Sequence, residues 1–275
     1  MTVCVSVKVN DCMVFAADSA ITMARSDGAI SNVYNSGDKV FNLHRGCPLA
    51  AMFCGMGTIG HRSISNLAKE FRYELMNGTL AIDAECYELE GVARRAYDFI
   101  AQKYADAPSE DTHSMEFFIG GFSSVAEHGQ LWKLGIASGA VFEPVLLRGE
   151  GDHGVNWAGQ ASPIGRLLLG VDPNFPAALI AKGVAPDAAN AAFSIAKDAL
   201  QIPLLADAMP TGDAIRLAEF LVDVTKGYFS FAPGADIVGG ESDVAAITKW
   251  EGFKWVHRKH YYPSDLNGAT NGHVC

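Results

Sequence analysis

The chain opens with MTVCVSVKVNDCMVFAADS (residues 1–19), and the interpretation of the fold starts from this stretch. Two apolar runs, 3–9 and 13–17, flank a polar turn, which is typical of a β-hairpin. Thr2 stands directly before the first run, and its small side chain predicts that methionine aminopeptidase removes Met1. The hydroxyl and a free α-amine would then belong to one residue. Because an α-amine has a pKa of about 8, it can take the proton of the hydroxyl, so Thr2 is predicted to be a nucleophile.

The composition limits the classes of function. The chain has 275 residues, of which 49% are hydrophobic, enough for a large buried core. Its formal net charge of −10 argues against nucleic acid or an anionic membrane as the main partner. No apolar run of about 18 residues predicts a membrane span, and the start lacks the pattern of a secretory signal. The six cysteines form no CxxC pair. We therefore expect a cytoplasmic protein with no metal and no cofactor.

The order of the expected elements predicts the fold class. Strands, two helices, strands, two helices and strands follow one another, which indicates an α+β fold: a four-layer αββα sandwich of two antiparallel sheets flanked by helices. One domain is expected over 1–260, with a polar, flexible extension at 261–275. The segment 20–38 is rich in small polar residues and is expected to be a surface excursion. The expected strands are 39–43, 49–55, 116–121, 130–136, 155–158, 244–247 and 254–256, and the expected helices are 64–75, 83–100, a short one from 163, 186–200 and 212–228.

Four segments of the chain resemble a proteasome β-subunit. They follow the order of that family, and the spacing from Thr2 to Asp18 matches it; the segments are Thr2, VFAADSAIT (14–22), KVFNL (39–43) and AAMFCGMG (50–57). The chain resembles most the bacterial relatives outside the actinobacterial proteasome, namely the betaproteobacterial homologue and the ancestral β-subunit type, and more distantly HslV. The resemblance covers 2–58 and 115–175, and extends over 185–250 by element order. It implies the N-terminal-nucleophile hydrolase fold.

The resemblance implies a role for each matching residue. Thr2 would attack a peptide carbonyl, and Lys39 would stabilise its deprotonated oxygen. Asp18 would pair with Lys39, and a carboxylate at the end of one strand can indeed meet an ammonium at the start of another. The backbone N–H of Gly55 would form the oxyanion hole. Gln160 stands where the family commonly has a serine that binds the nucleophile's amine, and its carboxamide could accept the same hydrogen bond.

The resemblance also implies how substrate is bound. Ile21, Phe53 and Gly57 would line the first substrate pocket, which predicts cleavage after large apolar side chains. Thr22 would pair with an extended substrate through its backbone. The further partners of the amine stay open among three residues: Asp223, Asp236 and Ser242.

Three features depart from the family pattern. Lys39 lies a few positions later than usual, so an insertion is expected within 23–37. Ala20 stands where many proteasome subunits carry arginine, and Gln160 replaces the serine. Each residue also has an ordinary structural interpretation, since threonine is common in strands and Asp-Ser commonly ends one. Their combination, order and spacing favour the catalytic interpretation.

These observations predict a self-compartmentalised threonine peptidase. Identical subunits would form stacked rings around a chamber, with peptides or unfolded proteins as substrates and an unfoldase of unknown identity as a further partner. One alternative is an N-terminal-nucleophile amidase that acts on a small acyl compound. The other is a catalytically idle ring scaffold; idle subunits usually lose the threonine, aspartate or lysine, and this chain keeps all three.

Overall fold

The computed structural model describes residues 2–24, 30–107, 114–233 and 237–259. The expected extension at 261–275 lies outside these residues. Two five-stranded antiparallel sheets and surrounding helices confirm the α+β class. The first sheet has the order β12 (Gly154–Gly159), β1 (Val3–Lys8), β2 (Cys12–Ala17), β13 (Asp243–Thr248) and β14 (Gly252–His257). The second has the order β11 (Ala140–Arg148), β10 (Gln130–Ala137), β9 (Met115–Gly121), β6 (Leu49–Gly55) and β5 (Val40–Asn42).

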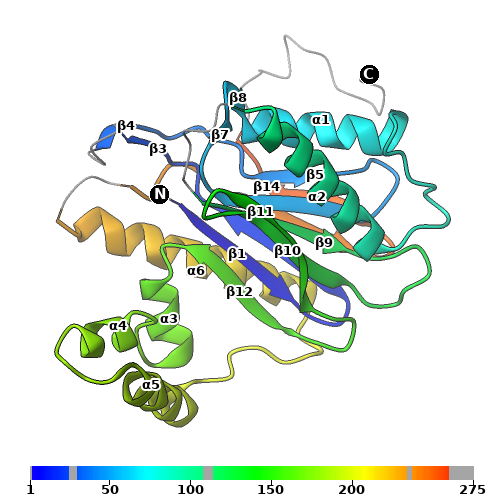
Figure 1. The fold of residues 1–275 in the computed structure, drawn as a ribbon. Helices are drawn as coiled ribbons and strands as arrows, with labels where there is room; N and C mark the ends of the chain where they lie inside the picture. Colours follow the sequence, from blue (N-terminus) through cyan, green and yellow to red (C-terminus); the bar gives the residue numbers. More distant parts are fainter. Residues whose placement is uncertain (1, 25–29, 108–113, 234–236, 260–275) are drawn as a thin grey trace.

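Helices pack on both sheets (Figure 1). Helix α6 contacts β1, β2 and β13 of the first sheet, whereas α2 contacts β9, β10 and β11 and α1 contacts β5 of the second. Helices α3, α4 and α5 gather beside α6 and away from the second sheet. The helices are α1 (Ile64–Asn77), α2 (Leu89–Ala105), α3 (Ser162–Leu169), α4 (Phe175–Ile180), α5 (Pro186–Leu200) and α6 (Thr211–Phe231).

The opening hairpin is buried because both of its faces are covered. Every residue of β1 and β2 is buried. Alternate residues of a strand face opposite sides, and Val3 and Val5 accordingly join the apolar cluster under α6, whereas Cys4 joins the cluster between the sheets. A third cluster lies between the second sheet and the helices α1 and α2. The apolar run at the start of the chain therefore forms a strand at the centre of the molecule.

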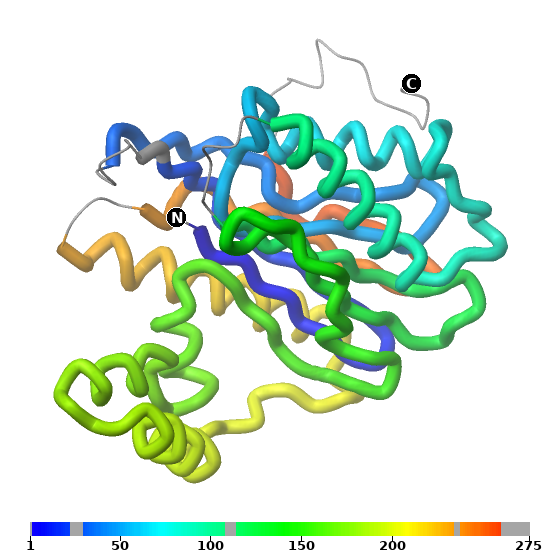
Figure 2. Tube along the Cα trace, viewed as in Figure 1, coloured from blue at the N-terminus to red at the C-terminus, as the bar shows by residue number. Residues whose placement is uncertain are grey.

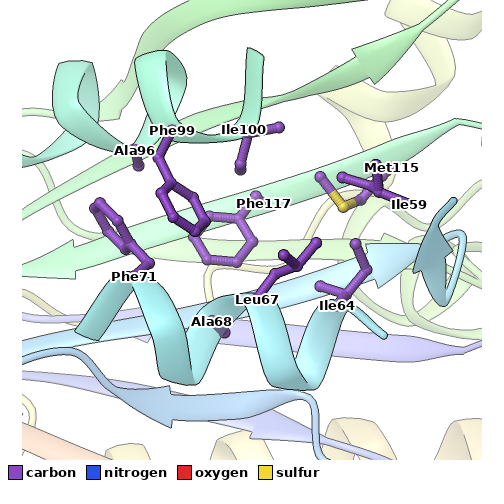
Figure 3. A pocket seen from close by; sticks show the side chains of 10 residues that line it. All are labelled: Ile59, Ile64, Leu67, Ala68, Phe71, Ala96, Phe99, Ile100, Met115 and Phe117. Carbon is purple, nitrogen blue, oxygen red and sulfur yellow. The ribbon is translucent and has the colours of Figure 1, made fainter. Parts of the chain in front are cut away.

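Helix α1 shows how the sequence pattern produces packing. Its predicted apolar stripe is buried, and Phe71 packs against Phe99 of α2 with ring centroids 5.4 Å apart. The side chain of Ser63 accepts a hydrogen bond from the N–H of Asn66 and caps the first turn. A cavity of about 10 Å³ between α1, α2 and β9 is lined by apolar side chains (Figure 3). It is a packing gap of the core, since a buried water needs polar partners.

Several expected elements differ from the structure. The segment 20–38 contains a two-stranded sheet, β3 (Ile21–Ala24) and β4 (Ile30–Tyr34), where only an excursion was expected. Strand β11 and helix α4 were not predicted, nor was the short ribbon of β7 (Thr58–Ile59) and β8 (Arg62–Ser63). Helix α2 begins at Leu89, and Asp83 instead accepts the N–H of Glu85 at 2.9 Å in the preceding turn. No helix within the described ranges has the length and apolarity to cross a bilayer.

Candidate active site

Thr2 is fixed by the strand that follows it. Val3 pairs with Gly159 of β12, and the carbonyl oxygen of Thr2 accepts the backbone N–H of Gln160 at 2.8 Å. A Cβ on Gly159 would lie 1.9 Å from that same oxygen, and Gly159 has a φ of +85°, so only glycine fits this close approach. The Thr2 residue is 5% exposed. The hydroxyl is thus held at one end of the first sheet by β-pairing on the chain's own backbone.

Lys39 joins Thr2 to Asp18. Its Nζ donates to Asp18 Oδ1 at 2.6 Å and also to Thr2 Oγ1. Thr2 Oγ1 donates in turn to the carbonyl oxygen of Ala20 at 3.4 Å. Asp18 and Lys39 are almost fully buried, and the carbonyl of Lys39 accepts the N–H of Phe53 in β6, which ties the lysine to the second sheet. The structure therefore brings together the three residues on which the sequence interpretation rests.

The carboxylate of Asp18 is fully bonded. Oδ1 accepts the N–H of Val3 at 3.0 Å, and Oδ2 accepts the N–H groups of Ala20 and Gly239, each at 3.1 Å. Gly239 lies in the residues that lead into β13, which are drawn in orange in Figure 2, beside Asp18 and Ser19 at the end of β2. A buried carboxylate is costly unless it is paired and hydrogen-bonded. These bonds therefore hold the carboxylate of Asp18 in one position, in contact with the ammonium of Lys39.

Gly55 and Gln160 border an open pocket of about 510 Å³ that Thr2 also lines. Gly55 ends β6 with a φ of +110°, and a Cβ there would lie 2.3 Å from the carbonyl oxygen of Ser114. The other lining residues come from β6, β9, β10, β11, β12 and the residue before β9: Cys54, Ser114, Glu116, Lys133, Ile136, Ala137, Phe142 and Gly159. A substrate group beside the hydroxyl of Thr2 would therefore lie against Gly55 and Gln160.

The residues expected to bind substrate do not line this pocket. Phe53 is 3% exposed and packs in the core under α1, stacked on Phe41 with ring centroids 6.1 Å apart. The side chain of Phe53 faces the helices, whereas that of the next residue, Cys54, faces the space between the sheets, since neighbouring residues of a strand point to opposite sides. Ile21 and Gly57 lie beside each other, since a Cβ on Gly57 would be 3.7 Å from Ile21 Cγ2. Thr22 pairs with Val33 in the β3–β4 sheet.

The residues considered as partners of the amine lie elsewhere or outside the described part. Asp236 falls among the residues that are not described. Asp223 and Ser242 both line a different recess, with Glu219, Glu241 and His257. Lys226 binds both of them, with its Nζ 3.5 Å from an oxygen of Asp223 and 3.2 Å from Ser242 Oγ.

Two buried cysteines stand next to the site. The thiol of Cys4 donates to the carbonyl of Phe53 at 3.1 Å. Burial, and then a hydrogen bond with Cys54, raises the pKa of the Cys4 thiol well above its ordinary value. A protonated thiol is a weak nucleophile, and the buried Cys4 is a residue of the core. In the part of the chain that the structure describes, no three metal-ligating side chains gather into a possible metal site.

Sequence reasoning missed three contributors to the site. The N–H of Gly239 gave no signal, because only the folded chain places it at Asp18. Glu116 and Lys133 did give a signal, since each is the one charged residue of a strand that is otherwise mainly apolar, MEFFIGG and QLWKLGIA. An isolated charge in a buried strand indicates either an ion pair or a functional position.

The two sheets and their helices define an α+β protein, in which Thr2, Asp18 and Lys39 form a candidate functional site. No family model and no curated protein matches the sequence. Among solved structures, the chain is similar to Anbu (ancestral beta-subunit) from Yersinia bercovieri, with 13% identity, a TM-score of 0.54, and coverage of 94% of this chain and 89% of that one. It is also similar to the Anbu of Pseudomonas aeruginosa, solved as a helical assembly, with 14% identity, a TM-score of 0.52, and coverage of 96% and 90%. An Anbu (Gly-1) mutant from Hyphomicrobium sp. strain MC1 has 15% identity, a TM-score of 0.51, and coverage of 94% and 86%.

These likenesses correct the family assignment made from the sequence. The assignment to the bacterial proteasome-like β-subunits is wrong as it stood, because the structural neighbours are Anbu proteins, which form a distinct family. At 13–15% identity the likeness shows the fold alone. The sequence led to the wrong family because the matching residues surround one hydroxyl and define only a local arrangement. More than one group of proteins can share such an arrangement.

Proposed function

We propose that the chain is a threonine peptidase whose nucleophile is the hydroxyl of Thr2, exposed at the N-terminus by removal of Met1. One observation carries the proposal: a buried lysine ammonium lies between the Asp18 carboxylate and the Thr2 hydroxyl. A cation in contact with a hydroxyl oxygen stabilises the alkoxide that attacks a carbonyl. Because a buried ion pair contributes little net stability, a purely structural role gives less reason for this arrangement.

The proposed reaction proceeds through an acyl-enzyme. The α-amine of Thr2, directly or through water, takes the hydroxyl proton, and Oγ1 attacks the peptide carbonyl while Lys39 stabilises the negative oxygen. The N–H of Gly55 would donate to the oxyanion, a contribution of about 3 kcal/mol to lowering the barrier. The proton then passes to the leaving amine, and water hydrolyses the ester. Gln160 holds the backbone of Thr2 and would accept a hydrogen bond from its amine.

The arrangement of layers supports the same proposal. Apolar clusters lie between the two sheets and between each sheet and its helices, as an αββα sandwich of the N-terminal-nucleophile hydrolase type requires. Ile21 and Gly57 lie close together, since a Cβ on Gly57 would be 3.7 Å from Ile21 Cγ2, and they would give a substrate pocket an apolar side. Thr22 pairs with Val33 of β4, and an extended peptide would pair along the opposite edge of β3.

Identical subunits are the proposed partners. Helices α5 and α6 expose several large apolar side chains, among them Ile195, which is 70% exposed, and Phe231, which is 91% exposed. Such surfaces favour association. The Pseudomonas aeruginosa neighbour is described as a helical assembly, so a closed double ring is one geometry among others for this chain. A cytoplasmic location is proposed because the described cysteines are free thiols.

Mass spectrometry tests the mechanism. The mature protein should begin at Thr2, and an epoxyketone inhibitor should add to that residue, since its ring adduct needs both hydroxyl and amine. Thr2→Ala should abolish the adduct and turnover, whereas the matched control Thr79→Ala, at an exposed threonine after α1, should keep both. Retention of Met1 or the lack of an adduct on a mature Thr2 contradicts the proposal. A monomer or dimer in sedimentation, with turnover of small acyl compounds only, would favour an amidase.

A further inference from the structure

The pocket beside Thr2 has a charged wall that the proposed chemistry does not use. Lys133 Nζ lies 2.7 Å from Glu116 Oε1, and both side chains line the pocket with Thr2 and Gly55. Their side chains are 29% and 36% exposed, so solvent and a bound ligand can reach them.

Strand alternation explains why the pair lies at the pocket. Phe118 of β9 and Leu131 of β10 belong to the apolar cluster between the sheets. Two residues further toward the Thr2 end, the same face of each strand carries Glu116 and Lys133. The space between the sheets is therefore apolar in the middle of the molecule and becomes charged where it opens beside the nucleophile.

The neighbouring positions complete this wall. Glu116 pairs with Cys54 on β6 and with Gly135 on β10, and Phe142 of β11 stands opposite Gly135. Cys54 and Phe142 also line the pocket. A partly exposed ion pair contributes at most about 1 kcal/mol to stability. Stability alone thus gives little reason for two charges in these strands.

We propose that the Glu116–Lys133 pair selects the substrate residue whose side chain enters this pocket, and that it favours a carboxamide side chain, as in glutamine or asparagine. This inference rests on the proposed peptidase function and names a second subsite, separate from the Ile21–Gly57 side. A carboxamide donates N–H groups to Glu116 and accepts from Lys133 at the same time. A charged side chain satisfies one partner and is repelled by the other, and an apolar one covers both without a hydrogen bond.

The test measures peptide binding rather than turnover. The full chain with Thr2→Ala is titrated with peptides that differ at one position, which carries Gln, Leu, Glu or Lys, and that position is moved along both sides of the scissile bond. At one position the Gln peptide should bind about tenfold more tightly than the others, equivalent to about 1.4 kcal/mol. Adding Glu116→Gln should shift the preference to the Glu peptide, and adding Lys133→Met should shift it to the Lys peptide.

Two further variants separate recognition from folding. Glu116→Lys combined with Lys133→Glu keeps an ion pair and should restore the Gln preference. Glu90→Gln breaks the exposed Glu90–Arg94 pair of α2 and should change no preference. If the single variants weaken all four peptides equally, or if the preference never changes, the pair has only a structural role and the inference fails. A native chain that shows this switch but cuts no peptide overturns the peptidase proposal instead.

Discussion

The buried pair of Asp18 and Lys39 predicts an asymmetric loss of stability. Asp18→Ala removes the acceptor of Lys39 and also of three backbone N–H groups, those of Val3, Ala20 and Gly239. Breaking a buried ion pair costs about 3–5 kcal/mol, and a buried donor left without an acceptor costs a further 1–3 kcal/mol or so. Lys39→Met removes one donor from a carboxylate that keeps three. Asp18→Ala should therefore cost about 5 kcal/mol or more, and Lys39→Met about 3 kcal/mol.

Urea unfolding followed by tryptophan fluorescence measures the difference at equal protein concentration. The free energies are compared only if the slopes with urea agree, since a changed slope signals a changed unfolded or native state. Asp18→Asn keeps one acceptor oxygen and should lie between the wild type and Asp18→Ala. Glu90→Gln on the surface should have no measurable effect. Equal costs for the two main variants, or a greater cost for Lys39→Met, would refute the role assigned to the three N–H groups.

Three further predictions follow from local geometry. Gly55→Ala should destabilise the protein by about 1–3 kcal/mol in urea unfolding, because Gly55 has a positive φ and a Cβ there would meet the carbonyl oxygen of Ser114. Gly57→Ala would make only ordinary contacts and should be tolerated. Burial lowers the pKa of His44, so the unfolded chain binds the proton more readily than the folded chain. The stability that neutral His44 contributes is therefore complete above its ordinary pKa of about 6.5 and is lost as the pH falls. His44→Gln should make the urea midpoint fall less steeply between about pH 7 and pH 5. Among the described cysteines, iodoacetamide should label exposed Cys86 in the native protein and leave buried Cys4 unmodified, as peptide mass mapping would show; labelling of Cys4 before Cys86 would contradict its burial.

Local patterns in the sequence predicted much of the secondary structure. The apolar stripe of α1 and the two apolar runs of the opening hairpin each form the expected element. The β3–β4 sheet was missed because its two strands are short and contain polar residues, so their sequence resembles a loop. The start of α2 was placed too early because Asp83 is a plausible cap, yet here it stabilises a turn.

The sequence by itself predicted the groups of the proposed chemistry: a threonine in second position, a carboxylate after the hairpin and a lysine before β5. Spacing alone did not determine the family, since the motif is short and the neighbouring structures belong to the distinct Anbu group. Only the tertiary structure decided that Lys39 contacts both Thr2 and Asp18, and that the N–H of Gly239 donates to the carboxylate of Asp18. It also decided that Glu116 and Lys133 line the same pocket. Periodicity is a property of neighbouring residues, whereas these contacts join segments far apart in the chain and form only when the two sheets pack.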